Sequence, residues 1–345
     1  MVPSENSCGG RLRKETGEMK VSVAVITYNQ EKTLSQTLDS ILMQKGDFQL
    51  EVVIGEDCSS DGTRQVVVDY QRRFPDIIRT ILQTKNRGIM GNAADTFLAC
   101  TGEYINMIAG DDYWIDEYKL DKQVRFLEAH PDYGLVTTDG YKLLVKKNRL
   151  VPGLPPVNPV ESGEVFSRFT NSFGVYAMPL TVLFRAELLR YIDFNEFERR
   201  RFSVEDTPLQ AILSHHARFG YIPDKTAVYR VYEESATFIS FDHPRYLDYH
   251  RGLVAIRQYL DELFPGEVAY SEEWADEYLF YREFLLYLHN LRHKDAKELI
   301  RRYSGKLSRS PKYIKSKKFA SSALLFILFH FYKERSYRKA ISQKI

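Results

Sequence analysis

Four short apolar runs, with helical segments between them, constrain the fold of this chain more than any other feature. The runs are Val21 to Tyr28, Glu51 to Gly55, Ile77 to Leu82 and Tyr104 to Ala109. Each is almost continuously apolar, which is typical of strands that are covered on both faces. The segments between them have helical spacing, at Glu31 to Leu42, Thr63 to Phe74 and Asn92 to Cys100. This alternation predicts an α/β fold with a mostly parallel sheet and helices on both faces.

Polar side chains follow each of these predicted strands. They are Thr27, Tyr28 and Asn29 after the first strand, Asp57 and Asp61 after the second, Asn86 after the third, and Asp111 and Asp112 after the fourth. Ligands of such sheets bind beyond the carboxyl ends of the strands, so we expect these residues to form one site. The sequence contains neither GxGxxG nor GxxxxGK[ST], so this edge lacks a glycine cradle for phosphate. Carboxylates hold a phosphate through a metal ion, and one such as Asp57 also accepts hydrogen bonds from a base or a ribose.

The fourth strand ends abruptly in Gly110-Asp111-Asp112. Two adjacent carboxylates at a strand end repel each other and lose hydration, and a divalent cation with oxygen ligands is the usual compensation. The alternative is a solvated Asp-Asp turn that caps a helix beginning near Asp116. This stretch alone favours neither interpretation.

A second acidic pair, Glu205-Asp206, stands just before a predicted helix that begins at Thr207-Pro208. Acidic residues at this place commonly complement the helix dipole, and by itself the pair favours that interpretation. Its alternative is a general base, which the motifs upstream make the stronger hypothesis.

Five motifs, in this order along the chain, resemble family 2 glycosyltransferases of the GT-A fold, of the bacterial cell-surface polysaccharide type. They are TYNQEKTL, EDCSSDGT, NRGIMGN, TGEYINMIAGDDYW and VEDTPL. The resemblance covers roughly residues 19 to 240. It implies a metal-dependent, inverting transfer of a sugar from a nucleotide-diphosphate donor to an acceptor hydroxyl, without a covalent intermediate.

The resemblance also implies roles for single residues. Asp57 would bind the nucleotide base, and Asp111 and Asp112 would hold the ribose and a Mg²⁺ or Mn²⁺ ion on the diphosphate. Asp206 would be the general base. The other predicted donor-binding residues are Thr27, Tyr28, Asn29, Asp61 and Asn86.

The chain departs from the family pattern at three positions. Ala109 stands where many members have an acid, Cys58 where glycine is common, and Tyr232 where many have histidine. Arg230 is then the candidate donor ligand of the last segment.

Composition divides the chain further. Residues 1–18 are expected to be unstructured, and Met19 is an alternative natural start. Residues 19–240 form the predicted GT-A domain, and residues 241–345 a helical extension. Its predicted helices are Tyr246 to Leu263, Ser271 to Leu291 and Asp295 to Tyr303, before a basic linker at Ser304 to Ser316.

Charge is distributed unevenly. Residues 292–345 hold 16 of the 48 Lys and Arg and 3 of the 46 Asp and Glu, so that they carry +13 and the remainder −11. Within this tail, Phe319 to Tyr332 is almost wholly apolar and flanked by lysines. A helix of this length spans about 21 Å, less than the ~30 Å hydrocarbon core. We expect it to lie in the interface of an anionic membrane, with a helix packed on protein as the alternative.

The three cysteines, Cys8, Cys58 and Cys100, have no metal-ligand spacing and suit a reducing compartment. The polar N-terminus lacks a secretory signal. These features, together with the basic tail, predict a cytoplasmic protein that is peripheral on the inner membrane. The resemblance implies that its partners are a nucleotide-sugar donor and a glycan or lipid-linked acceptor.

Three other functions remain open. A nucleotidyltransferase would use a similar carboxylate-lined edge, but the chain lacks a Gly-rich phosphate loop. A non-catalytic nucleotide-sugar binder would be compatible with Ala109 and Tyr232. Nucleic-acid binding through the tail is disfavoured, because the tail has an apolar block rather than interleaved aromatic residues.

Overall fold

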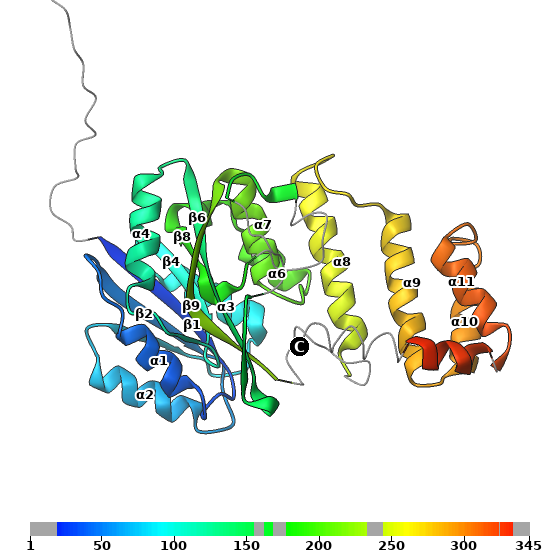
Figure 1. Ribbon diagram of the computed structural model, residues 1–345, viewed down its shortest axis with the longest axis horizontal. Helices are drawn as coiled ribbons and strands as arrows, with labels where there is room; N and C mark the ends of the chain where they lie inside the picture. The colour runs from blue at the N-terminus through cyan, green and yellow to red at the C-terminus, as the bar shows by residue number, and fades with distance from the viewer. Residues whose placement is uncertain (1–18, 155–161, 168–176, 233–243, 324, 334–345) are drawn as a thin grey trace, which may run out of the picture.

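The computed structural model describes residues 19–154, 162–167, 177–232, 244–323 and 325–333 (Figure 1). An α/β body carries a helical extension on one side. The predicted unstructured residues 1–18, and residues 155–161 of a proline-rich segment, lie outside the described residues.

One mixed sheet forms the centre of the body. Its strands are ordered β3-β2-β1-β4-β8-β6-β9-β5, and β7 pairs with β6. Their bounds are β1 Lys20–Thr27, β2 Gln49–Glu56, β3 Ile78–Leu82, β4 Tyr104–Ala109, β5 Tyr113–Trp114, β6 Tyr133–Leu144, β7 Arg149–Pro152, β8 Val182–Arg185 and β9 Arg218–Val231.

The four predicted strands are present and parallel, as β1 to β4. The second half of the sheet is mixed, because β6 and β9 pair in parallel while other neighbours are antiparallel. β8 runs antiparallel to both β4 and β6, and β5 antiparallel to β9. The long strand β6 forms a hairpin with β7, which follows it in the chain.

Helices cover both faces of this sheet, because successive residues of β1 point to opposite sides. Val21, Val23 and Val25 pack in one core with the apolar faces of α1 Leu34–Leu42, α2 Thr63–Arg73 and α4 Lys119–Ala129. Ala24 and Ile26 belong to the other core. The helices on that side are α3 Gly88–Ala99, α6 Phe194–Arg199, α7 Asp206–His216 and α8 Tyr246–Leu263.

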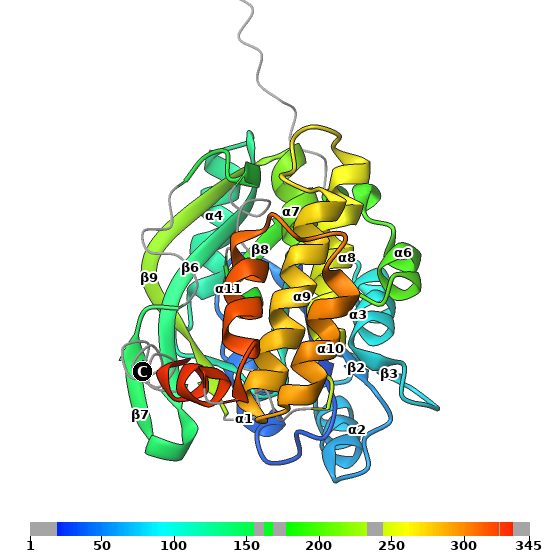
Figure 2. The same cartoon turned by 90° about the vertical axis from the view of Figure 1, so that its right-hand side faces the viewer.

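The extension continues from α8 through α9 Glu272–His289, α10 His293–Tyr303 and α11 Pro311–Ala320. Figure 2 faces α9, α10 and α11, which pack side by side around their own apolar core. The three predicted helices are confirmed. Residues 304–310 of the predicted basic linker join α10 to α11, but residues 311–316 belong to α11. The hydroxyl of Ser310 accepts a 3.2 Å hydrogen bond from the Tyr313 N–H and caps α11, and Pro311 fits its first position.

The apolar block from Phe319 to Tyr332 is divided rather than continuous. α11 ends at Ala320, and residues 325–333 form a further helix that we name the terminal helix. Phe326 and Phe329 are buried in the core of the extension, so the packed alternative holds for one face of the terminal helix. Among the helices within the described residues, none is long and apolar enough to cross a membrane.

Candidate functional site

The register of the parallel strands brings the predicted polar residues to one edge of the sheet. Thr27 pairs with Glu56, and Ile26 pairs with Ala109. The residues that follow these positions therefore leave the sheet side by side, as the strand pattern predicted.

Asp57 is buried at this edge and links two loops. Its Oδ1 accepts a 2.6 Å hydrogen bond from the Arg87 N–H, and its carbonyl oxygen accepts one of 3.1 Å from the side-chain amide of Asn86. Burial, and then the neighbouring Glu56, raise the pKa of Asp57 despite the Arg87 N–H. The group thus holds the start of α3.

Asn29 and Asp61 tie the loop after β1 to the loop after β2. The Ser60 N–H donates to Asn29 Oδ1 at 2.9 Å, and Asn29 itself is left-handed with φ 54°. Asp61 Oδ1 accepts a hydrogen bond from the N–H of Thr63, the first residue of α2, at 3.0 Å, while Oδ2 accepts from the Glu31 N–H at 3.2 Å. Although burial acts to raise the pKa of Asp61, these hydrogen bonds lower it. In this structure both side chains shape the loops, and their binding to a donor stays a prediction.

Thr27 and Tyr28 differ in exposure. Thr27 is buried and its hydroxyl donates to Gln30 Oε1 at 2.8 Å, whereas Tyr28 is 47% exposed. Tyr28 therefore offers a ring surface at the edge of the sheet, and Thr27 supports the loop beneath it.

The Asp111-Asp112 turn is held from below by α1. The hydroxyls of Thr33 and Thr37 donate to the Gly110 carbonyl at 2.9 and 3.0 Å, and Thr37 also donates to the Asp112 carbonyl at 2.6 Å. A Cβ at Gly110 would stand 2.6 Å from Gln30 Oε1, so glycine permits this close approach.

Both carboxyl groups of the turn are shielded from water. Burial raises the pKa of Asp111. Burial and the charge of Asp111 raise the pKa of Asp112 well above its ordinary value. The two carboxyl groups therefore lack the full hydration of a surface turn. This differs from the alternative interpretation of the sequence, a solvated Asp-Asp turn that caps a helix.

Arg230, at the end of β9, approaches this pair directly. Its N–H donates to Asp112 Oδ1 at 2.8 Å, and its guanidinium donates to the Asp111 carbonyl and to Gln36 Oε1. The guanidinium also lies 4.6 Å from the centroid of the Tyr113 ring. Nearby, burial and the charge of Asp111 raise the pKa of Tyr232. The structure thus brings the candidate Arg230 to the predicted site.

The donor set is compatible with a metal that arrives with its substrate. Within the described ranges, no three His, Cys, Asp or Glu residues group into a metal site. Mg²⁺, however, typically takes only one or two protein carboxylates, together with substrate phosphates and water. Two shielded carboxylates with raised pKa values, Asp111 and Asp112, suit that arrangement.

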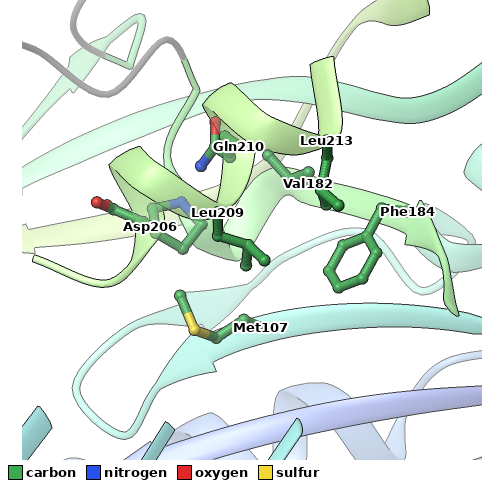
Figure 3. A pocket seen from close by; sticks show the side chains of 8 residues that line it. Met107, Val182, Phe184, Asp206, Leu209, Gln210 and Leu213 are labelled. Carbon is green, nitrogen blue, oxygen red and sulfur yellow. The ribbon is translucent and has the colours of Figure 1, made fainter. Parts of the chain in front are cut away.

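Asp206 lies on the other side of β4. It is the first residue of α7, one position inside the helix rather than before it as predicted. Asp206 and Met107 of β4 line one small apolar cavity (Figure 3), together with Pro179, Val182, Phe184, Leu209, Gln210 and Leu213. Burial raises the pKa of Asp206 to about 6, although the Thr207 hydroxyl donates to its Oδ1 at 3.1 Å. Burial and the charge of Asp206 raise the pKa of Glu205 to about 8.

Strand β4 therefore connects the two acidic elements. Met107 lies beneath Asp206, and Asp111 follows four residues later in the same direction.

Several contacts at the site were missed from the sequence. Gln30, Gln36, Thr37, Arg87 and Tyr113 all bond or contact the predicted residues. Gln30 and Tyr113 belong to the motifs TYNQEKTL and TGEYINMIAGDDYW. Their membership of these motifs was the sequence signal that could have identified them as site residues. Gln36 and Thr37 lie in a helical pattern that shows no sign of what they contact.

Comparison with known proteins follows this geometry. Residues 22–176 match the family described as Glycosyl transferase family 2. An uncharacterized protein of Mycobacterium tuberculosis is 40% identical over 112 residues, which are 32% of this chain and 32% of the relative's own length. EpsE of Bacillus subtilis has been assigned provisionally as a glycosyltransferase. It is 29% identical to this chain, over 64% of this chain's length and 75% of the length of EpsE.

Solved structures show the same fold. Staphylococcus aureus TarS 1–349 in complex with UDP-GlcNAc superimposes with a TM-score of 0.55 at 21% identity, over 88% of this chain and 81% of that one. The mannosyltransferase PcManGT of Pyrobaculum calidifontis, in complex with GDP-Man and Mn²⁺, superimposes with a TM-score of 0.52 at 18% identity. The match covers 92% of this chain and 88% of that one.

Proposed function

We propose that this chain transfers a sugar from a nucleotide-diphosphate donor to an acceptor hydroxyl with inversion, because its residues 22–176 match the family described as Glycosyl transferase family 2 and its fold is that of the solved GT-A glycosyltransferases. One observation carries the proposal. Met107 of β4 lines the same cavity as the buried base candidate Asp206. The same strand ends just before the shielded Asp111-Asp112 pair, at the edge of the sheet where Asp57 also lies.

The donor half of the site is built from the loops after β1, β2 and β4. Asp57 would accept hydrogen bonds from the base, and Tyr28 would contact it through its exposed ring. Asp111 and Asp112 would hold a Mg²⁺ or Mn²⁺ ion, which supplies stabilisation of the charge on the departing diphosphate when bound. The Arg230 guanidinium adds a fixed positive charge beside the same carboxylates.

The acceptor half depends on Asp206. With a pKa of about 6, its carboxyl is ionised at neutral pH and can take the proton of the acceptor hydroxyl. Glu205, with a pKa of about 8, keeps its proton there, so the pair does not carry two adjacent charges. The position of Asp206 at the first turn of α7 also places its charge at the favourable end of the helix dipole.

The setting proposed for this activity is the synthesis of a cell-surface polysaccharide or a lipid-linked glycan. The relative TarS carries the name poly(ribitol-phosphate) beta-N-acetylglucosaminyltransferase, which supports a cell-surface acceptor for this family member also. The basic, apolar tail supports a peripheral position on the cytoplasmic face of the membrane.

A screen of nucleotide sugars tests the proposal. Thermal stabilisation and hydrolysis should appear with one donor, and should be lost in EDTA. Asp206→Asn serves as the matched control, because it should still be stabilised by the donor but should not turn it over. Binding by both proteins without transfer to any acceptor would support a nucleotide-sugar binder instead, and the absence of any stabilisation would overturn both.

A further inference from the structure

The terminal helix has two distinct faces. Phe326 and Phe329 point into the extension and are 1% and 3% exposed. The opposite side, which we name the apolar face, consists of side chains between 37% and 63% exposed: Leu325, Ile327, Leu328, Phe331 and Tyr332. At about 100° per residue these five side chains share one side of the helix, and no charged residue interrupts them.

The packed side holds the terminal helix in place. The ring of Phe329 stacks on Phe319 with centroids 3.8 Å apart, and Phe326 meets Phe284 edge to face at 6.0 Å. His330 Nδ1 lies 3.0 Å from the Leu288 carbonyl oxygen. The apolar face is therefore presented by an anchored helix, and its exposure follows from the way the helix packs.

Lysines lie close to the terminal helix, beside its packed side. The ammonium groups of Lys315 and Lys333 lie 5.8 and 5.5 Å from the centroid of the Phe329 ring, one from α11 and one from the end of the terminal helix. Lys317 and Lys318 are exposed on α11 as well. The apolar face thus belongs to a strongly basic part of the chain, residues 292–345, which carry +13. This combination is complementary to a bilayer that has anionic headgroups above an apolar interior.

The terminal helix and the donor-binding edge lie toward the same side of the molecule. In Figure 1, β1 enters the body at the upper left and ends toward the lower right, and the terminal helix, in red, is also in the lower part of the view.

We propose that the apolar face inserts into the headgroup region of an anionic membrane, which the net positive charge of residues 292–345 attracts. The inference deepens and rests on the proposed function, because it makes a hydroxyl on a lipid-linked glycan the acceptor class that the site would meet. Insertion is shallow, since the terminal helix is too short to span the hydrocarbon core.

The test is co-sedimentation of the full chain with vesicles, in the absence of any nucleotide sugar. The protein should sediment with phosphatidylcholine vesicles that contain phosphatidylglycerol, less at high salt, and little with phosphatidylcholine alone. Leu328→Glu/Phe331→Glu should lower the bound fraction at least about tenfold. The matched control is Leu98→Glu, which changes a 70% exposed leucine on α3 in the α/β body and should bind as the parent does.

Folding and donor binding are followed separately. Both variants should keep the parent's circular dichroism spectrum and its thermal stabilisation by the donor. Vesicle binding is measured without a nucleotide sugar, so it can be interpreted even if the catalytic proposal fails. Equal sedimentation of the double variant and the parent would overturn the inference. So would a parent that stays in solution with every vesicle, or a parent dimer that the double variant abolishes without any vesicle binding, which would identify the apolar face as a contact between two copies.

Discussion

The backbone N–H of Arg230 donates a 2.8 Å hydrogen bond to Oδ1 of Asp112, and so joins residues 118 positions apart in the chain. This bond ties the end of β9 to the turn after β4. The guanidinium of the same residue reaches the Asp111 carbonyl, so that one arginine both positions the acidic turn and offsets its charge.

Replacing the Arg230 side chain should weaken the donor site without removing the backbone bond. Arg230→Ala is expected to lower nucleotide-sugar affinity about tenfold, or ~1.4 kcal/mol, because a fixed positive charge beside the diphosphate is lost. Isothermal titration would measure it. Arg125→Ala, which removes an exposed arginine on α4, is the control. An affinity equal to the parent's would show that Arg230 acts through its main chain alone.

The acidic turn should oppose stability in the absence of metal. Burial holds the pKa of Asp112 well above its ordinary value, so the folded protein binds its proton more tightly than the unfolded chain does. The unfolding free energy then falls as pH rises above the unfolded value of about 3.9. Asp112→Asn should therefore raise Tm at neutral pH by about 2–4 °C, equivalent to ~1 kcal/mol.

The same variant should lose metal-dependent donor binding, because an amide is a weaker ligand than a carboxylate. Differential scanning fluorimetry with and without Mn²⁺ and donor would measure both effects. A lower Tm together with unchanged donor affinity in EDTA would contradict the assignment of Asp111 and Asp112 as a metal site.

Turnover should depend on the ionisation of Asp206. A base with a pKa of about 6 must be deprotonated to act, so kcat should fall as pH drops below that value. Asp206→Asn should reduce kcat by roughly a hundredfold while donor affinity stays close to the parent's. Equal losses of affinity and turnover would instead indicate that Asp206 serves only as the start of α7.

Its neighbour Glu205 should leave a signature in stability. The folded pKa of about 8 is above the ordinary value of 4.5, so the folded state holds the proton across that window. Stability therefore falls as pH rises from one value to the other. Glu205→Gln should flatten this decline, and its advantage in Tm over the parent should grow with pH. Parallel Tm curves for the two proteins would show that Glu205 does not titrate there.

Close packing between α8 and the segment before α7 should affect catalysis. A Cβ at Gly252 would stand 1.9 Å from the Ser203 hydroxyl oxygen and 2.6 Å from its backbone nitrogen. That hydroxyl donates to the Tyr249 carbonyl at 2.5 Å, so Gly252→Ala should displace the turn that leads to Asp206.

The expected result is a lower kcat with an unchanged KM for the donor, measured in steady-state kinetics. Gly305→Ala is the control, because its added Cβ would meet nothing within 4 Å. A Gly252→Ala variant with the parent's kcat would show that the extension does not influence the base.

The sequence by itself determined the features that depend on neighbours along the chain. Near-continuous apolar runs predicted β1 to β4, and parallel pairing then required Asp57 and Asp111 to leave the sheet at one edge. Helical spacing predicted α8 with the bounds that it has, Tyr246–Leu263. These predictions succeed because hydrophobic periodicity is a local property that burial of one face or both faces imposes.

Only the tertiary structure decided which polar groups meet. Arg230 reaches Asp112 because β9 returns to the sheet beside β5, and the Asp61 carboxylate is bound by loop N–H groups that no local pattern reveals. The apolar block of the tail likewise divides into packed and exposed faces, since Phe326 and Phe329 find partners in α9 and α11. Such contacts join residues far apart in the chain, and their formation depends on the packing of whole elements rather than on residue spacing.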